Sequence, residues 1–199
     1  MFLRRDGDCR VTVIERDPAY RTASSSLSAS SIRQQFSSPV NIALSQFGIA
    51  FLRDAAVQLG CDGDAPSLSL REPGYLYLAS PAGLPVLQAN HATQRAHGVA
   101  VALLDPQALR ERFPWLSTEG VAAGSLGLDG EGWFDGPALM QAFRRKARAL
   151  GASYVHGEVV GLEHGRTVTG VRLADGSRIA CGTVVNAAGR WARSVAAMA

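Results

Sequence analysis

The chain has 199 residues, 47% of them hydrophobic and 19% charged, which is enough for one large domain or two small ones around a buried core. It has no apolar run of about 18 residues and no leader-like start, so we expect a soluble, intracellular, cytoplasmic protein without a transmembrane segment. Its net charge of +3 comes from scattered arginines, which excludes the clustered basic surface of a nucleic-acid-binding protein. The cysteines are widely spaced and predict neither a disulfide framework nor a zinc site.

The first strand is predicted from Cys9 to Glu15, after a short helical stretch at Met1 to Arg5. Its apolar, β-branched residues are typical of a parallel-sheet strand that is buried on both faces. Glu15 falls at the carboxyl end of this strand, and Pro18 ends it. In a dinucleotide-binding α/β fold, an acid at this position binds the adenosine ribose hydroxyls. The alternative is that Glu15 is only the first solvated residue after a core strand.

The next segment, Arg21 to Ser38, is rich in serine and other small residues. Such residues let the backbone approach a ligand closely, and their hydroxyls and amides can bind a pyrophosphate group. The segment is short, and Ile32 and Phe36 have i, i+4 spacing, which argues against a flexible linker. Arg33 is a candidate for binding a substrate carboxylate, with a salt bridge as its alternative role.

Alternating helices and strands are predicted from residue 39 to residue 113. A long helix from Pro39 to Leu59 begins with proline in its first turn and is followed by Gly60. Its mostly apolar face comprises Ile42, Ala43, Gln46, Phe47, Ala50, Phe51 and Ala55. The further elements are a strand at 74–80, a helix at 84–97, a strand at 99–104 and a helix at 105–113 that Asp105 caps.

The glycine-rich segment from Gly120 to Gly136 is predicted to form short strands and turns. The helix that follows, from Gly136 to Leu150, is capped by Asp135 and leads by a crossover into another strand. Short strands at 158–162, 168–173 and 178–180 come next, with a hairpin turn at 174–177. The last stretch, from Thr183, is predicted to be a strand that ends in small residues and opens a final helix.

Together these stretches resemble the FAD-dependent oxidoreductases of the D-amino-acid oxidase family, which includes sarcosine and glycine oxidases. Five shared features follow the order of the family. The first two are an acid after the second strand (Glu15) and a serine-rich loop that leads to an arginine (Ser24 to Arg33). The other three are an aromatic-Asp helix start (133–135), a segment that begins G-A (Gly151 to Val159) and a V-V-N-A-A-G-x-W turn (184–191). The order and spacing of all five carry the resemblance, and the last motif is the most specific.

The resemblance implies which residues bind FAD. Glu15, with Arg16 beside it, would hold the adenosine ribose, and Val159 would contact adenine through its backbone. The flavin path would be lined by Ser24, Ser25, Ser31, Ile32 and Arg33. The FAD phosphates or ribityl chain would lie close to Ala187, Ala188 and Gly189, with Trp191 next to them. The sequence assigns no residue a catalytic role, and it predicts no metal site.

The resemblance also implies an α/β fold: an incomplete FAD/NAD(P)-binding Rossmann-like domain with an inserted α+β substrate domain. The FAD-binding domain would comprise residues 1–66 and 135–199, and residues 67–134 would be part of the substrate-binding domain. The G-x-G-x-x-G turn of the family is not found in the sequence. We therefore expect a chain truncated at both ends that, alone, binds FAD weakly or not at all and is inactive.

The implied activity is oxidation of the C–N bond of an amino acid or N-methyl amino acid, such as sarcosine, glycine or a D-amino acid, by hydride transfer to the flavin. The electrons would then pass to oxygen or to another acceptor. Two alternatives stay open. One is a flavoprotein assembly factor with little turnover, because I-R-Q-Q-F-S resembles a mitochondrial subgroup that includes such a factor. The other is an NAD-dependent dehydrogenase that uses Glu15 as its ribose-binding acid.

Overall fold

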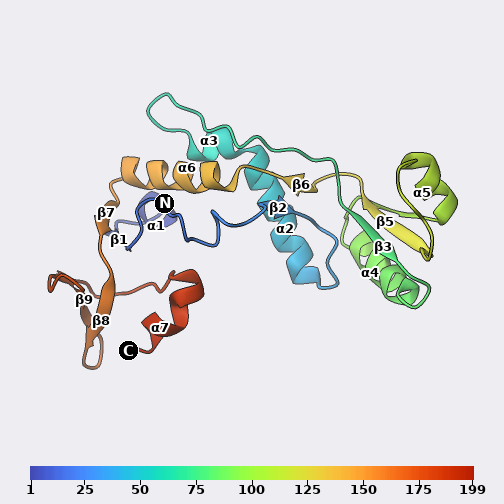
Figure 1. The fold of residues 1–199 in the computed structure, drawn as a ribbon. Coiled ribbons are helices and arrows are strands. Elements are labelled where there is room, and N and C mark those ends of the chain that lie inside the picture. The colour runs from blue at the N-terminus through green and yellow to red at the C-terminus, as the bar shows by residue number, and fades with distance from the viewer. The chain divides into compact units, whose positions relative to one another are not determined.

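The computed structural model describes all 199 residues, and they divide into two compact units. Unit 1 comprises Met1–Ser28, Cys61–Asp64 and Leu139–Ala199, and unit 2 comprises Ala29–Gly60 and Ala65–Ala138. Figure 1 shows the elements of both units. The expected FAD-binding and substrate domains are defined by function rather than by packing, so that division stays a prediction. No helix combines the length and the apolar character that crossing a membrane requires.

Unit 1 is built on two small sheets. In the first, β1 (Thr12–Glu15) runs parallel to β7 (Ser153–His156), with Glu15 opposite His156. The second is antiparallel, has the strand order β10-β9-β8, and is formed by β8 (Val159–His164), β9 (Val168–Leu173) and β10 (Arg178–Ala180). The helices of this unit are α1 (Phe2–Arg5), most of α6 (Gly136–Ala149), the 3-10 helix η1 (Gly189–Trp191) and α7 (Ala192–Ala196).

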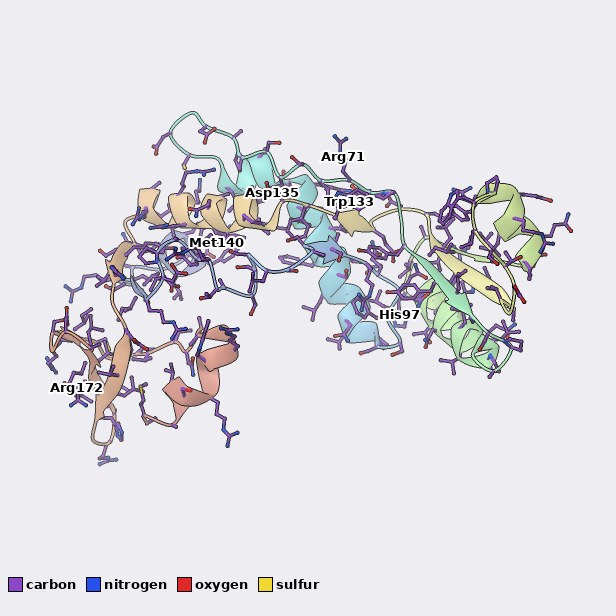
Figure 2. The ribbon with its side chains drawn as sticks, in the orientation of Figure 1. Arg71, His97, Trp133, Asp135, Met140 and Arg172 are labelled. Atoms are coloured by element: carbon purple, nitrogen blue, oxygen red, sulfur yellow. The ribbon has the colours of Figure 1, made fainter.

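Local sequence signals explain several of these elements. Asp135, labelled in Figure 2 at the start of α6, accepts a hydrogen bond from Ala138 N at 2.8 Å, which confirms the predicted cap. The strand after α6 pairs in parallel with β1, as a crossover connection requires. The hairpin between β9 and β10 is also confirmed: Asp175 Oδ1 accepts from Ser177 N at 2.9 Å, and Gly176 has a φ of 85°.

Two predictions for the strands of unit 1 are wrong. The first strand begins at Thr12 rather than Cys9, and it is half-buried rather than buried on both faces, because β7 is its single neighbour. The predicted strand after Thr183 does not form. A parallel strand needs a neighbour that supplies hydrogen bonds, and Asn186 closes a local turn instead. Its side chain accepts from Ala188 N at 3.2 Å and donates to Ala192 O at 2.8 Å. The final helix does form, as η1 and α7.

Unit 2 contains a three-stranded antiparallel sheet of order β3-β5-β4, formed by β3 (Leu76–Ala79), β5 (Ala123–Gly127) and β4 (Val101–Leu104). The helices α4 (Leu84–Ala96) and α5 (Pro106–Arg112) lie beside it (Figure 1). A second, antiparallel pair consists of β2 (Ser31–Ile32) and β6 (Gly132–Trp133). The remaining helices are α2 (Pro39–Arg53) and α3 (Ala55–Leu59).

The single helix predicted from Pro39 to Leu59 is broken at Asp54. Asp54 leaves the helical region, with φ −97° and ψ 7°, and its carboxylate accepts a hydrogen bond from Gln58 Nε2 at 2.7 Å. A hydrogen bond between side chains four residues apart stabilises a helix, so this contact supports the turns that begin after Asp54. The helix therefore restarts as α3.

The predicted apolar face of this helix is confirmed only in part, because Ile42 and Ala55 are buried but Phe47 is 69% exposed. The side that is buried comprises Ile42, Ile49, Leu52, Ala55 and Leu59. Ile42 joins Val99 and Val101 in a core of unit 2, and Phe36 packs against this core. Ile42 and Ala55 belong to both sets, and tertiary packing decides that Ile49 and Leu52 are covered while Phe47 stays exposed.

Candidate functional site

Glu15 is the last residue of β1, as predicted. Its Oε1 accepts a hydrogen bond from Asp17 N at 2.8 Å, and Asp17 in turn accepts from Ala19 N and Arg21 N, so the chain turns directly after the strand. The Glu15 side chain is half-buried. Burial raises the pKa of Tyr20, and the nearby Glu15 carboxylate raises it further.

Arg16, Trp191 and Glu158 meet beside the end of β1. The Arg16 guanidinium carbon lies 3.9 Å from the centre of the Trp191 ring, and Arg16 Nη1 lies 3.6 Å from Glu158 Oε1. Arg190 also lies over the Trp191 ring, at 4.2 Å. The residue after Glu158 is Val159, the first residue of β8. Side-chain contacts of Arg16 therefore join the end of β1 to the turn at Trp191 and to the start of β8.

The turn before Trp191 has an open backbone. Ala187 and Gly189 are exposed and Ala188 is half-buried. Gly189 has a φ of 55°, and no atom lies within 4 Å of the position that a Cβ would occupy. A ligand can therefore approach the peptide groups of this turn closely.

Ser24 and Ser25 lie in a turn of unit 1, in which Ser26 N donates to Ala23 O at 3.0 Å. Both side chains are exposed, so their hydroxyls are accessible to a ligand. Unit 1 thus holds the predicted residues Glu15, Arg16, Ser24, Ser25, Val159, Ala187, Ala188, Gly189 and Trp191.

Ser31, Ile32 and Arg33 belong to unit 2, where the structure adds a strand that the sequence did not predict. Ser31 lies opposite Trp133 and Ile32 opposite Gly132. Figure 2 shows Trp133 near Arg71, and the backbones of these two residues exchange hydrogen bonds of 2.9 Å. Arg33 directly follows this short strand.

The Arg33 side chain is exposed and stacks on an aromatic ring, with its guanidinium carbon 4.9 Å from the centre of the Phe36 ring. Arg33 forms no ion pair in the structure, so its alternative role as a salt-bridge partner is not found. It borders a hollow of about 410 Å³, here called the Arg33 hollow, which is lined by Ser31, Arg33, Phe36, Asn41, Leu44 and Ser45. An arginine without a carboxylate partner at such a hollow suits an anionic ligand.

Sequence reasoning missed Glu131, whose carboxylate accepts hydrogen bonds from the two residues that follow Arg33. Its side chain is fully buried, and four N–H groups donate to its two carboxylate oxygens. A signal was present in the glycines around it. A Cβ added at Gly127 would overlap Glu131 Oε2, one at Gly130 would overlap Gln34 Nε2, and one at Gly132 would overlap Arg71 O. These three glycines make the room in which the acid is enclosed.

The charges of Arg33 and Glu131 both affect the pKa of Tyr77, which lies on β3. Burial raises its pKa above the ordinary tyrosine value, Arg33 lowers it and Glu131 raises it. The Tyr77 phenol therefore lies within electrostatic reach of Arg33 and of Glu131.

The fold and these groups of residues define an FAD-dependent oxidoreductase domain of the α/β class. The model of the DAO family, described as FAD dependent oxidoreductase, matches residues 1–199, and the chain belongs to this family. The predicted resemblance and the predicted FAD cofactor are thereby confirmed, and the alternative of an NAD-dependent dehydrogenase is set aside.

Among curated proteins, the chain is 40% identical to FAD-dependent oxidoreductase domain-containing protein 1 of Xenopus laevis, over 98% of this chain and 43% of that protein. It is also 40% identical to the protein of the same name from Bos taurus, over 98% of this chain and 44% of that protein. The chain thus spans less than half the length of these relatives.

Among solved structures, L-proline dehydrogenase from P. horikoshii superposes with a TM-score of 0.83 and 28% identity, over 98% of this chain and 50% of that one. Glycine oxidase from Geobacillus kaustophilus superposes with a TM-score of 0.81 and 24% identity, over 99% of this chain and 53% of that one. The second likeness shows the fold alone. Together with the family match, they confirm the predicted fold class as a partial FAD-binding α/β domain.

The chemistry of two features of unit 1 fits this cofactor. In unit 1, a strand-end carboxylate suits the ribose hydroxyls, and the open backbone at Gly189 suits close approach of phosphate. FAD, when bound, supplies the acceptor for a hydride. The protein supplies the groups that bind and orient the reactants.

Proposed function

We propose that the protein oxidises the C–N bond of a small amino acid or N-methyl amino acid. The substrate amine loses a hydride from carbon to the flavin and a proton from nitrogen, which gives an imine, and water then hydrolyses the imine to a carbonyl compound and an amine or ammonia. Support comes from the match to an FAD-dependent family and from the 28% identity to a structure titled L-proline dehydrogenase. Glycine oxidases share the fold. The electron acceptor is oxygen or another oxidant.

The observation that carries this proposal is Arg33, an arginine without a carboxylate partner that is stacked on Phe36 at a hollow of about 410 Å³. The carboxylate of an amino acid is the anion that its guanidinium would bind. Arginine and carboxylate match in geometry, and a charge-assisted pair between them orients the substrate as well as binding it. The apolar Phe36 and Leu44 beside it would accept the substrate side chain.

For the cofactor, we propose that Glu15 and Arg16 bind the adenosine ribose and that Val159 contacts adenine. In the same unit, Ala187, Ala188 and Gly189 would approach the phosphates or ribityl chain, with Trp191 held beside them, and Ser24 and Ser25 would line the flavin path. In unit 2, Ser31, Ile32 and Arg33 would do so. The exposure of the serines and the open turn at Gly189 support these roles.

Flavin reduction tests the activity. Proline, sarcosine, glycine and D-alanine are added without oxygen to the FAD-loaded protein, and the loss of the flavin's visible absorbance is followed. We expect at least one of them to bleach the flavin. Arg33→Gln should raise the KM for that substrate about tenfold or more, since a hydrogen bond to a charged group is worth about 1.5–3 kcal/mol.

Arg95→Gln is the matched control, because Arg95 is an exposed arginine on α4 of the same unit that does not border the hollow. Its KM should equal that of the wild type. If FAD binds but no amine reduces it, the activity proposed here is wrong and the assembly-factor alternative is favoured. Because this chain alone is expected to bind FAD weakly or not at all, the test uses the full-length protein, and if FAD does not bind there, the cofactor residues above are wrong.

A further inference from the structure

Glu131 is unusual because its carboxylate is buried without a cation beside it. It is fully buried and takes part in no ion pair. A carboxylate accepts at about four lone-pair positions, and here four N–H donors occupy them. Oε1 accepts from Gln34 N at 2.7 Å and Gln35 N at 3.1 Å, and Oε2 accepts from Gln35 Nε2 at 2.9 Å and Tyr75 N at 3.2 Å.

These donors concentrate on one segment. Three of the four belong to Gln34 and Gln35, the two residues that follow Arg33. On the other side of Arg33, Ile32 lies opposite Gly132, the residue after Glu131. The carbonyl of Arg33 itself accepts from Ser45 Oγ. The backbone on both sides of Arg33 is therefore tied to Glu131 and its neighbour.

The Gln35 side chain extends this network to the sheet of unit 2. Its Nε2 also donates to Tyr75 O at 2.9 Å, and its Oε1 accepts from Ser125 Oγ at 2.7 Å. A buried polar network of this kind holds one conformation when every member has a partner. The segment that carries Arg33 is thus connected to β3 and β5 through Glu131 and Gln35.

We propose that Glu131 is a positioning residue for Arg33: its carboxylate orders Gln34 and Gln35, and so holds the Arg33 guanidinium over Phe36 at the Arg33 hollow. This inference rests on the proposed function, in which Arg33 binds the substrate carboxylate. Glu131 does not touch the ligand. Its effect on the ligand passes through the backbone of the segment.

Two physical effects of Glu131 on a bound carboxylate have opposite signs. Through space, its negative charge disfavours an anion at the hollow, so replacing it by a neutral group would strengthen carboxylate binding. Through positioning, the replacement would disorder the segment of Arg33 and weaken that binding. The direction of the change therefore separates positioning from a purely electrostatic role.

Glu131→Gln is the informative substitution because it keeps the shape of the side chain. The new amide group is a donor, so two of the four N–H groups face another donor whichever way the amide is turned. Asp105→Ala is the matched control. It removes the cap of α5 in the same unit, where Asp105 Oδ1 accepts from Ala108 N, and it contacts neither Gln34 nor Gln35.

The experiment measures equilibrium binding to the full chain by NMR titration with two pairs of probes, proline with prolinamide and sarcosine with sarcosinamide. Each pair differs only in the carboxylate. We expect the wild type and Asp105→Ala to prefer the carboxylate about tenfold or more. In Glu131→Gln and in Arg33→Gln the preference should fall at least about fivefold. The double variant should resemble Arg33→Gln alone, because both changes act through the same group.

The outcomes separate the two claims. If the wild type shows no preference, or Arg33→Gln keeps it, the proposed role of Arg33 is wrong. If Arg33→Gln loses the preference while Glu131→Gln keeps or increases it, Arg33 binds the carboxylate and the positioning role of Glu131 is overturned. If Glu131→Gln does not fold, Gln35→Ala takes its place. It removes one of the four donors and should lower the preference about twofold, and an unchanged preference would overturn the inference.

Discussion

Truncating Ile42 tests how the core of unit 2 supports the candidate site. Ile42 is fully buried and packs with Val99 and Val101, and Phe36 packs against this cluster. Phe36 in turn carries the guanidinium of Arg33, whose carbon lies 4.9 Å from its ring centre. A cavity at Ile42 should therefore loosen the ring on which Arg33 rests as well as destabilise the unit.

The magnitude follows from the burial. Ile42→Ala removes three buried carbons, which at about 0.8 kcal/mol each amounts to about 2.4 kcal/mol of transfer free energy. The cavity left behind adds to this, so we expect the free energy of unfolding to fall by about 2–5 kcal/mol. Native domains are stable by about 5–15 kcal/mol, so the loss is a large fraction of the total.

The assay is urea unfolding followed by circular dichroism. The matched control is Val40→Ala, on the same helix and outside the Arg33 hollow, because Val40 is 63% exposed and its truncation should change the free energy by no more than about 0.5 kcal/mol. The Ile42 variant should also bind proline more weakly than the control does. If the two variants lie within about 1 kcal/mol of each other, the core assigned to α2 is wrong.

Three further outcomes are expected. Asp105→Ala should lower the free energy of unfolding by about 0.5–2 kcal/mol, because Ala108 N loses its acceptor at the start of α5, and an unchanged urea midpoint would contradict this cap. Trp191→Leu should destabilise unit 1 by about 1–2 kcal/mol, since the ring carries both Arg16 and Arg190, each contact being worth about 0.5–1 kcal/mol; equal stability of variant and wild type would refute the stack. Burial raises the pKa of Tyr77, Tyr20 and Tyr154 in the folded state, so stability is fully present below the unfolded tyrosine pKa of about 10 and is lost as pH rises through the folded values. Thermal unfolding across that range should show a smaller decline for Tyr77→Phe than for the wild type, and an identical decline would speak against burial of this phenol.

The sequence alone determined the features that depend on neighbours along the chain. Asp135 and Asp105 cap their helices because the side chain and the N–H group it accepts from are three residues apart. Gly176 and Asp175 form the hairpin turn for a similar reason. The order and spacing of five local motifs, from the acid at the end of β1 to the turn at 184–191, indicated the family, which the match to residues 1–199 confirms.

The tertiary structure decided what depends on residues far apart in the chain. The apolar residues of α2 extend around the helix, and only tertiary packing decides that Ile49 and Leu52 are covered while Phe47 stays exposed. The stretch after Thr183 has the composition of a strand, but a strand also needs a hydrogen-bonding neighbour, and none pairs with it.

Glu131 shows the same limit at the candidate site. Its identity as an acid between two glycines is visible in the sequence, but the donors that enclose it come from Gln34 and Gln35, 96 or 97 residues away. Hydrogen-bond partners at such separations are brought together only when the chain has folded, because no local periodicity relates them. The sequence therefore identified Arg33 as a candidate ligand-binding residue. Only the tertiary structure revealed Glu131, the carboxylate that holds the backbone around Arg33 in place.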